Sequence, residues 1–349
     1  MGKVSKSLER ITFLLPGRNL SGGVRVTARM AQELQVLGQP VRVLYKTGPK
    51  IGRLQRSVRR IVGGQFGKGK DWLTAVPYEV CGVRNLDDID CSTDRCVISV
   101  GTLMSEHIRG RVFPCMKIRY CHGFSSNLGA VARSAWQGDD PIISVSPALV
   151  ETLRDLSGRH EIPVVPNGID RGEYFIEPGV NRTGIGLVYN SHPKKDPLTA
   201  LRVVDRLSGL GHPIYVFGAE KRPRGIERES YSRAPTVSQA RAIYNRCKVW
   251  IIPSRSEGFC LPILEAMACG TAVVSTDHDT VRGLIDDGLN GLLRPVGDDS
   301  GLAAAAEALM AEEGQRSRIV SEGLATVSRF PWRDAAESLL KAIQRFETL

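Results

Sequence analysis

Two acidic residues, Glu257 and Glu265, flank a glycine-bearing turn with seven residues between them. Residues 253–274 read as the end of a buried strand, the turn, a short helix and a second buried strand. A strand-to-helix turn of this kind points backbone N–H groups at whatever lies above the helix N-terminus, which favours a phosphate. A carboxylate one or two helical turns further along can accept hydrogen bonds from a pair of sugar hydroxyls. We therefore expect a phosphate and a sugar to bind here together.

The same segment resembles the donor-site motif of the family-4 retaining glycosyltransferases, the glycosyl transferases group 1. Residues 254–259 match Ser-x-x-Glu-Gly-Phe before the turn, and residues 264–270 match Leu-Glu-Ala-Met-Ala-x-Gly after it. The resemblance implies a retaining enzyme that moves a sugar from a nucleotide-diphosphate sugar to an acceptor hydroxyl. The donor would be a UDP-, GDP- or dTDP-sugar or a similar compound, and the family needs no cofactor and no essential metal.

The resemblance also implies roles for the residues of this motif. Glu265 would accept the ribose hydroxyls of the donor, and Glu257 would contact the donor sugar as a catalytic residue. Backbone N–H groups in the turn would hold the phosphate and the sugar. The further donor-binding residues expected in this segment are Ser254, Gly258, Phe259, Cys260 and Leu261.

Two elements of the N-terminal half are similar to further family motifs. Gly22 and Gly23 follow the first predicted strand, where glycine lets the backbone approach a ligand closely. The family has a Gly-Gly element at this point that faces the donor phosphates and the acceptor. His122 follows another predicted strand, at the edge where open α/β sheets bind ligands. The family carries a histidine there that reaches the donor sugar, so we predict a catalytic role for His122.

The segment around Lys195 departs from the family pattern. The family has Gly-Arg at the end of the first strand of its second domain and a lysine a few residues later, and both cations neutralise the diphosphate. Lys195, or Lys194 after a shift of one position, matches the lysine, and we predict a catalytic role for Lys195. Asn190 or Ser191 stands where the arginine is expected, and Asn190 is counted among the donor-binding residues. Neutralisation would then depend on one lysine and the backbone, or on a further cation such as Arg18 or Arg25.

Positioning these residues requires two series of alternating strands and helices. Apolar runs at residues 11–15, 41–44, 96–100, 117–121 and 142–145 predict the strands of a first parallel sheet. Residues 185–189, 214–218, 248–252 and 272–274 predict a second sheet. We expect an α/β protein of the GT-B type, with two Rossmann-like doubly wound domains facing a cleft. The first domain would span residues 1–175, joined by a C-terminal helix at 331–349 that returns to it. The nucleotide-sugar domain would span residues 180–328.

The composition of this 349-residue chain indicates its compartment and the kinds of partner it can bind. No run approaches the roughly 18 apolar residues needed to cross a bilayer, and the N-terminus lacks the apolar core of a secretory signal. We therefore expect a cytoplasmic protein. The eight cysteines show no paired spacing typical of a metal site, so we expect no metal. The formal net charge of +10 favours anionic partners such as phosphorylated substrates or anionic membranes.

Residues 46–70 contain eight Lys and Arg and no acidic residue. Within residues 50–62 apolar side chains recur at helical spacing, which is typical of a helix that lies on a membrane surface. The alternative is a helix packed on the first domain with a solvated basic face. The first interpretation places the protein peripherally on the inner face of the membrane, with a glycan or lipid-linked acceptor. Nucleic-acid binding is disfavoured, because few aromatic residues lie nearby and no binding motif is evident.

Two other classes of function remain open from the sequence. A non-catalytic protein of the same fold, binding a sugar or a partner, is favoured by the departure at Asn190. An epimerase or a phosphorylase on the same architecture would react without an acceptor or would depend on inorganic phosphate.

Overall fold

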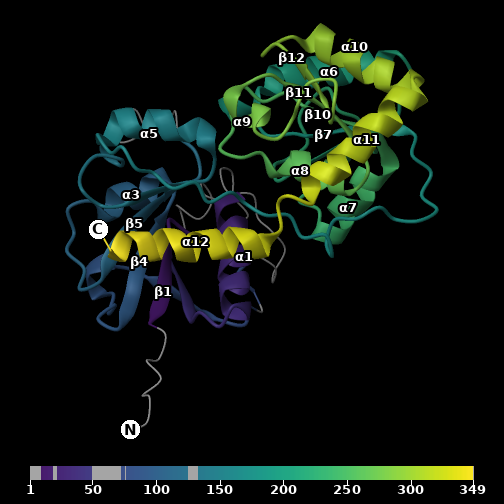
Figure 1. The fold of residues 1–349 in the computed structure, drawn as a ribbon. Helices are drawn as coiled ribbons and strands as arrows, with labels where there is room; N and C mark the ends of the chain where they lie inside the picture. Colours follow the sequence, from purple (N-terminus) through teal and green to yellow (C-terminus); the bar gives the residue numbers. More distant parts are fainter. Residues whose placement is uncertain (1–8, 19–21, 49–71, 75, 125–132, 349) are drawn as a thin grey trace, which may run out of the picture. The chain divides into compact units, whose positions relative to one another are not determined.

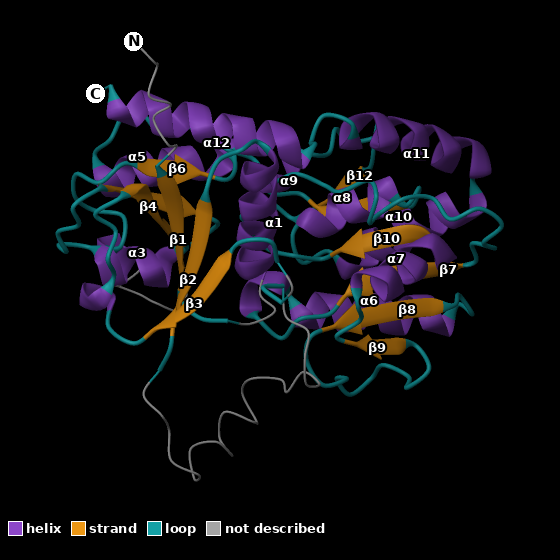
Figure 2. Cartoon of the chain, turned by 90° about the horizontal axis from the view of Figure 1, so that it is seen from below, coloured by secondary structure: helices purple, strands orange, loops and turns teal. Residues whose placement is uncertain are grey.

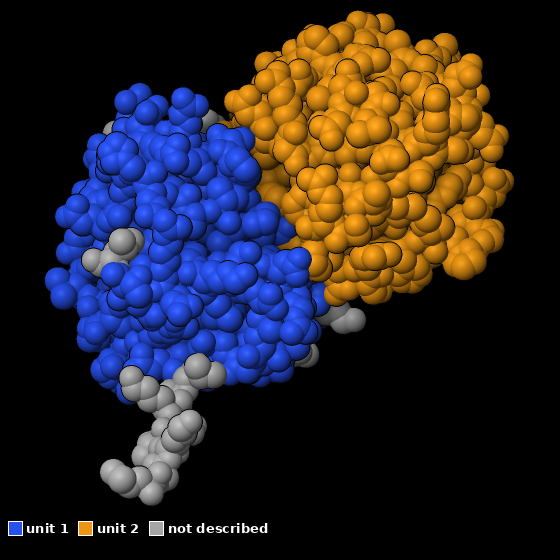
Figure 3. Space-filling model, in the orientation of Figure 1, with its two compact units in different colours: residues 1–167, 332–349 blue, residues 168–331 orange. Residues whose placement is uncertain are grey.

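The computed structural model describes residues 9–18, 22–48, 72–74, 76–124 and 133–348. The chain divides into two compact units. Unit 1 comprises Met1–Asn167 and Trp332–Leu349, and unit 2 comprises Gly168–Pro331 (Figure 3).

Unit 1 is built on a six-stranded sheet in which every neighbouring pair of strands is parallel, in the order β3-β2-β1-β4-β5-β6. The central strands are buried almost throughout, as expected for a parallel sheet covered on both faces. The strands are β1 (Arg10–Leu15), β2 (Val41–Lys46), β3 (Glu79–Val83), β4 (Asp94–Val100), β5 (Met116–Cys121) and β6 (Ile142–Ser144).

The helices of unit 1 include the last helix of the chain. This helix, α12 (Trp332–Glu347), packs against α1 (Gly22–Val36) in Figures 1 and 2. It buries Ala336, Leu339 and Ile343, which recur at helical spacing and form its inner face. The predicted return of the C-terminal helix to the first domain is thus confirmed. The other helical elements described in this unit are α3 (Thr102–Ile108), α5 (Val150–Ser157) and the 3₁₀ turns η1 (Leu86–Asp88) and η3 (Pro147–Leu149).

Unit 2 repeats this plan with a second parallel sheet, in the order β12-β11-β10-β7-β8-β9. Its strands are β7 (Gly184–Val188), β8 (Ile214–Gly218), β9 (Tyr231–Arg233), β10 (Cys247–Ile252), β11 (Ala272–Thr276) and β12 (Leu292–Arg294). Its helical elements are η4 (Pro193–Lys195), α6 (Pro197–Gly209), α7 (Val237–Arg246), α8 (Leu261–Ala268), α9 (Asp279–Arg282), α10 (Asp299–Ala311) and α11 (Glu313–Val327).

Both sheets share the strand order of doubly wound nucleotide-binding folds. When the strands of each unit are renumbered from one to six, the order is 3-2-1-4-5-6 in both cases. In such a sheet the loops after the first and fourth strands leave in opposite directions, and ligands bind at the carboxyl ends near this point. In unit 2 the corresponding strands are β7 and β10, which are hydrogen-bonded neighbours. The predicted fold class of two Rossmann-like domains is confirmed.

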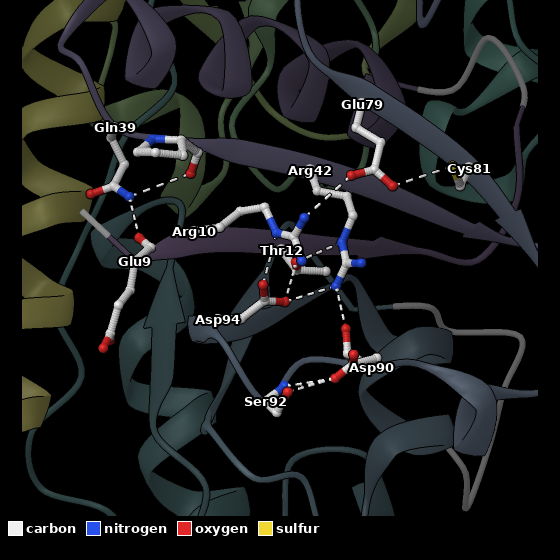
Figure 4. Close-up of polar contacts among 11 residues, drawn as sticks. Glu9, Arg10, Thr12, Gln39, Arg42, Glu79, Cys81, Asp90, Ser92 and Asp94 are labelled. Atoms are coloured by element: carbon white, nitrogen blue, oxygen red, sulfur yellow. Dashed lines mark hydrogen bonds and ion pairs between the residues drawn. The ribbon is translucent and has the colours of Figure 1, made fainter. Parts of the chain in front are cut away.

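The amino-terminal ends of the strands in unit 1 are joined by a buried polar network (Figure 4). The carboxylate of Asp94, at the start of β4, accepts hydrogen bonds from Thr12 Oγ1 at 2.6 Å and from Arg10 Nε at 2.8 Å. Arg42 in β2 donates to the same carboxylate at 2.8 Å and to Thr12 Oγ1 at 3.1 Å. The Asp94 side chain is fully buried, so these partners compensate for the loss of hydration of its charge. The network therefore holds three neighbouring strands in register.

Candidate active site

The turn after β10 and the start of α8 place backbone N–H groups at the carboxyl edge of the sheet in unit 2. Cys260 precedes the helix with φ 70° and ψ 61°, which is the left-handed region. Pro262 lies in the first turn of the helix, where its missing N–H costs no intrahelical hydrogen bond. The first N–H groups of a helix have no intrahelical acceptor and carry the positive end of the helix dipole. The predicted residues Gly258, Phe259, Cys260 and Leu261 all lie in this turn or at the first position of the helix.

Glu257 lies in the same turn and is bound by a lysine from the neighbouring loop. Lys195 Nζ contacts the two carboxylate oxygens of Glu257 at 2.5 and 2.7 Å, and Ser254 Oγ donates to Oε1 at 2.7 Å. Burial disfavours the charged amine, but attraction to Glu257 outweighs this and raises the pKa of Lys195 overall. Lys195 is therefore cationic at neutral pH. The structure thus brings three predicted residues, Ser254, Glu257 and Lys195, into direct contact.

The loop after β7 positions Lys195 through local hydrogen bonds. Asn190 Oδ1 accepts from the backbone N–H of His192 at 2.8 Å, and the short turn η4 follows and carries Lys195. Asp196 then caps helix α6, with its carboxylate accepting from Thr199 N at 3.3 Å. The side chain of Asn190 therefore shapes the loop at the position where the family pattern has an arginine.

Arg255 is a cation of this region that was not predicted from the sequence. Its guanidinium lies 2.9 Å from the carboxylate of Asp196, and its backbone N–H donates to Lys194 O at 2.7 Å. Arg255 therefore ties the loop after β10 to the loop after β7. Its place between Ser254 and Ser256, inside the recognised motif, is the signal that would have indicated it.

Glu265 lies one turn into α8 and is almost completely buried, with 4 % of its surface exposed. Its Oε2 accepts a hydrogen bond of 2.8 Å from the hydroxyl of Tyr244 on α7. A buried carboxylate needs such a partner, because an unpartnered charge would lose its hydration without compensation. Tyr244 was not predicted from the sequence.

His278 also lies close to this cluster. It lies two residues after the end of β11 and directly precedes helix α9, in which Thr280 Oγ1 donates to the backbone oxygen of Glu257 at 2.8 Å. Burial lowers the pKa of His278, and the nearby Glu257 opposes this shift. Its Nε2 is buried and has no hydrogen-bond partner among the residues that the structure describes. Nothing in the sequence alone set His278 apart from a surface histidine.

The predicted residues of unit 1 lie at the carboxyl ends of β1 and β5. Gly22 and Gly23 are the first two residues of α1, and a Cβ atom at either position would meet nothing within 4 Å. His122 directly follows β5, and its ring lies 4.2 Å from that of Tyr120. Burial lowers the pKa of His122 to about 4, so the imidazole is neutral at physiological pH. Within the described ranges its Nε2 is buried without a hydrogen-bond partner.

The two arginines considered as replacement cations have partners within unit 1. Arg18 donates to Thr74 Oγ1 at 3.1 Å, and its guanidinium lies 5.8 Å from the ring centroid of Tyr45. The guanidinium of Arg25 lies 5.0 Å from the ring of Trp72. The predicted basic helix at residues 50–62 lies outside the described residues.

All eight cysteines carry free thiols. In the part of the chain that the structure describes, no group of three or more His, Cys, Asp or Glu side chains has the arrangement of a metal site. No described helix combines the length and the apolar character needed to cross a bilayer.

Comparison with known proteins agrees with this geometry. Residues 192–312, which contain η4, β10 and α8, match the sequence model of the family described as Glycosyl transferases group 1. The part of unit 2 that carries Lys195, Glu257 and Glu265 is therefore similar to this family, and the two doubly wound sheets are those of a GT-B fold.

Among named proteins, the chain is similar to a D-inositol 3-phosphate glycosyltransferase of Xylanimonas cellulosilytica, with 27% identity over 242 residues that cover 58% of each chain. It is also similar to a phosphatidyl-myo-inositol mannosyltransferase of Mycobacterium leprae, with 37% identity over 92 residues that cover 26% of this chain and 25% of the relative. The aligned part spans less than two thirds of the length of each of these relatives.

Solved structures show the same fold over nearly the whole chain. Sucrose-phosphate synthase from Thermosynechococcus elongatus superposes with a TM-score of 0.73 and 16% identity, covering 97% of this chain and 99% of that one. Anabaena Alr3699/HepE, solved in complex with UDP and glucose, superposes with a TM-score of 0.72 and 16% identity, covering 97% and 100%.

Proposed function

We propose that the protein is a retaining glycosyltransferase that transfers a sugar from a nucleotide-diphosphate sugar to an acceptor hydroxyl. The observation that carries this proposal is the cluster at the carboxyl ends of β7 and β10. There a lysine–glutamate pair, Lys195 and Glu257, lies beside the N-terminal turn of α8, which also carries Glu265. Cationic and N–H groups suit a diphosphate, and the two carboxylates suit sugar hydroxyls.

In this proposal the diphosphate binds to the N–H groups at the turn from Gly258 to Leu261. Lys195 leaves its contact with Glu257 in part and binds the diphosphate, and Glu257 then accepts hydrogen bonds from the donor sugar. Glu265 accepts the ribose hydroxyls. Because the leaving group is a nucleoside diphosphate, catalysis consists mainly of positioning and of neutralising the charge that develops on the phosphate.

For unit 1 we propose that Gly22, Gly23 and His122 contact the donor phosphates or sugar, as the family resemblance implies. The neutral His122 can donate or accept one hydrogen bond through Nε2, depending on its tautomer. Ser254 and Asn190 act by holding Glu257 and the loop of Lys195, respectively.

For the acceptor we propose a glycan or a lipid-linked molecule. Two of the similar proteins support this, because they are named for phosphatidyl-myo-inositol, a lipid, and for lipopolysaccharide core biosynthesis. A third is named for D-inositol 3-phosphate, a small phosphorylated molecule. The basic composition of residues 50–62 supports a cytoplasmic protein that binds peripherally to an anionic membrane. We therefore propose that the reaction belongs to lipid-linked glycan or surface polysaccharide synthesis.

A second candidate is a non-catalytic protein of this fold that binds a nucleotide sugar. Asn190 favours it, because a neutral amide stands where the family has an arginine for the diphosphate. Donor binding without turnover in any acceptor mixture would support this candidate over the enzyme.

The test has two parts. The melting temperature is measured with UDP-, GDP-, ADP- and dTDP-sugars, since a ligand at 100 times its Kd stabilises a protein by about 2.7 kcal/mol. The nucleotide sugar that raises the melting temperature is then incubated with the protein, and release of nucleoside diphosphate is followed. We expect one class of donor to stabilise the protein and to be turned over.

The variant Lys195→Met tests the proposed contact between Lys195 and the diphosphate. It should weaken the binding of the nucleoside diphosphate roughly 10- to 100-fold, because a hydrogen bond to a charged group contributes about 1.5–3 kcal/mol. Lys248→Met is the control, because Lys248 is a partly buried lysine at the amino end of β10, at the opposite edge of the same sheet. Equal affinities for both variants would contradict the proposed role of Lys195.

A further inference from the structure

Tyr244 is a fully buried tyrosine whose hydroxyl points at the carboxylate proposed to bind ribose. It lies in the last turn of α7 and has no exposed surface. Its hydroxyl donates to Glu265 Oε2 at 2.8 Å. The two residues come from consecutive helices of unit 2 but lie 21 positions apart in the sequence.

The Tyr244 side chain is fixed in place from several sides. Its ring lies 4.2 Å from the ring of Trp250 and 5.6 Å from that of Phe217, measured between centroids. Its backbone oxygen accepts a hydrogen bond from Thr271 Oγ1 at 2.8 Å. Close packing on this scale leaves a buried ring one rotamer, so the hydroxyl has a fixed direction.

The chemistry of the pair fixes which atom donates. Burial raises the pKa of Tyr244 well above its ordinary value, and the charge of Glu265 raises it further. The phenol therefore stays protonated at physiological pH and acts as a donor to Glu265. A carboxylate has two oxygens with about four acceptor sites in total. One hydrogen bond from Tyr244 to Oε2 thus orients the group while leaving it the capacity to accept others.

From this geometry we propose that Tyr244 is a positioning residue that orients the Glu265 carboxylate toward the hydroxyl pair of the donor ribose. The inference rests on the proposed function of Glu265. It makes Tyr244 a determinant of the preference for ribonucleotides over 2′-deoxyribonucleotides, although Tyr244 itself touches no ligand. A supporting shell of this kind is what holds a binding carboxylate within the narrow range of geometries that its ligand accepts.

A purely structural role for Tyr244 makes a different prediction. If the hydroxyl served only to satisfy a buried carboxylate, its loss would lower stability and would weaken the binding of every nucleotide equally. A positioning role acts on the contacts of Glu265 with the ribose hydroxyls, so its loss weakens the binding of the ribose form more than that of the 2′-deoxy form, which keeps only the 3′-hydroxyl. The ratio of two affinities measured on the same folded sample therefore separates the two roles.

The experiment measures Kd by calorimetry for the pairs UDP and 2′-deoxy-UDP, GDP and 2′-deoxy-GDP, and ADP and 2′-deoxy-ADP. The proteins are the full-length chain and its variants Tyr244→Phe, Glu265→Gln and Tyr78→Phe. Tyr78 is the matched control, because its buried hydroxyl donates to a backbone oxygen, Ala28 O, at 2.9 Å in unit 1. For the pair that binds best, we expect the unaltered protein to prefer the ribose form roughly 10-fold, the effect of one hydrogen bond to a charged group.

We expect Tyr244→Phe to reduce this preference at least threefold, with a smaller loss of affinity for the 2′-deoxy form than for the ribose form. Tyr78→Phe should keep the full preference. An unchanged preference in Tyr244→Phe, together with a reduced one in Glu265→Gln, would overturn the role of Tyr244 while leaving that of Glu265 intact. An unchanged preference in Glu265→Gln would overturn the ribose role of Glu265, and the proposal for Tyr244 with it.

Tyr244→Phe keeps the ring and its packing, so we expect it to fold. Should it not, 3-fluorotyrosine at position 244 provides a second measurement. Its more acidic hydroxyl donates a stronger hydrogen bond to Glu265 Oε2 and draws charge from the carboxylate, so the preference for the ribose form should change, and an unchanged preference would contradict the proposal.

Discussion

Cys260 occupies a backbone conformation that favours glycine. Its φ of 70° lies in the left-handed region, and its side chain is buried at the start of α8. This conformation costs a non-glycine residue roughly 1–2 kcal/mol. The structure retains it because the turn must bring the N–H groups of residues 258–261 to the edge of the sheet.

A comparison of two variants tests this strain. Cys260→Gly and Cys260→Ala both remove the thiol, but only glycine relieves the backbone. We expect the glycine variant to be more stable than the alanine variant by about 1 kcal/mol in urea unfolding. Equal stability of the two variants would show that the turn is not strained at this residue.

His122 makes stability depend on pH because its native pKa of about 4 lies below the ordinary value of 6.5. Between pH 6.5 and 4 the unfolded chain binds a proton that the native imidazole does not. The contribution of His122 to the free energy of unfolding is therefore fully present above pH 6.5 and is lost as the pH falls toward 4. The total loss is about 3 kcal/mol at most.

The measurement is urea unfolding at several pH values between 4 and 7. His122→Gln should flatten the profile in this window, because glutamine does not titrate. His160→Gln, a substitution at an exposed histidine, controls for the loss of an imidazole elsewhere in unit 1. A profile in His122→Gln as steep as in the unaltered protein would contradict the assigned cause.

Single residues also mark the limit of what the sequence could predict about the site. The two glutamates Glu257 and Glu265 and the lysine after β7 could be predicted, because they lie in short segments that resemble motifs of the family. Tyr244 could not, because what distinguishes it is a hydrogen bond made across the fold. His278 could not, because the burial of its Nε2 without a partner among the described residues depends on the packing around it. The ion pair between Lys195 and Glu257 could not be predicted either, because the two residues lie 62 positions apart in the sequence.

At the scale of elements, the sheets were predicted best where their strands are buried on both faces. β10 and β11 read as apolar runs because both of their faces are covered. β3, β9 and β12 were not predicted. They are short edge strands, and β3 and β9 are mostly exposed, so none of them carries the apolar pattern that identifies a strand.

The network around Asp94 provides a prediction for the elements of unit 1. Asp94→Ala removes the carboxylate that compensates Arg42 and leaves Thr12 without its acceptor. Removing one partner of a buried ion pair lowers the free energy of unfolding by about 3–5 kcal/mol. We expect the free energy of opening at the β1 and β4 amides, measured by hydrogen exchange, to fall by this amount. Hydrogen exchange reports on the strands of unit 1 separately from those of unit 2.

Asp90→Ala is the control for this prediction. The Asp90 side chain is exposed, and Arg42 bonds only its backbone oxygen, which the substitution retains. The control should leave the protection of β1 and β4 nearly unchanged. Similar losses in both variants would mean that the network contributes nothing specific to the register of the strands.

At the scale of the whole molecule, both units have the same strand order, but the proposed donor-site residues of the recognised motif all come from unit 2. The lysine, the two glutamates and the helix N-terminus of the proposed donor site all lie in unit 2, beside the point where its strand order reverses. The charge of +10 could be read from the sequence, but the donor and the acceptor could not. Those depend on side chains that no single motif specifies.

The most direct test of the central claim is a crystal structure of the protein with the nucleoside diphosphate that stabilises it most. We predict that the diphosphate contacts the N–H groups of the turn from Gly258 to Leu261 and Lys195 Nζ, with the ribose hydroxyls on Glu265. A diphosphate bound elsewhere in the molecule, with this turn unoccupied and the Lys195–Glu257 pair unchanged, would contradict the account.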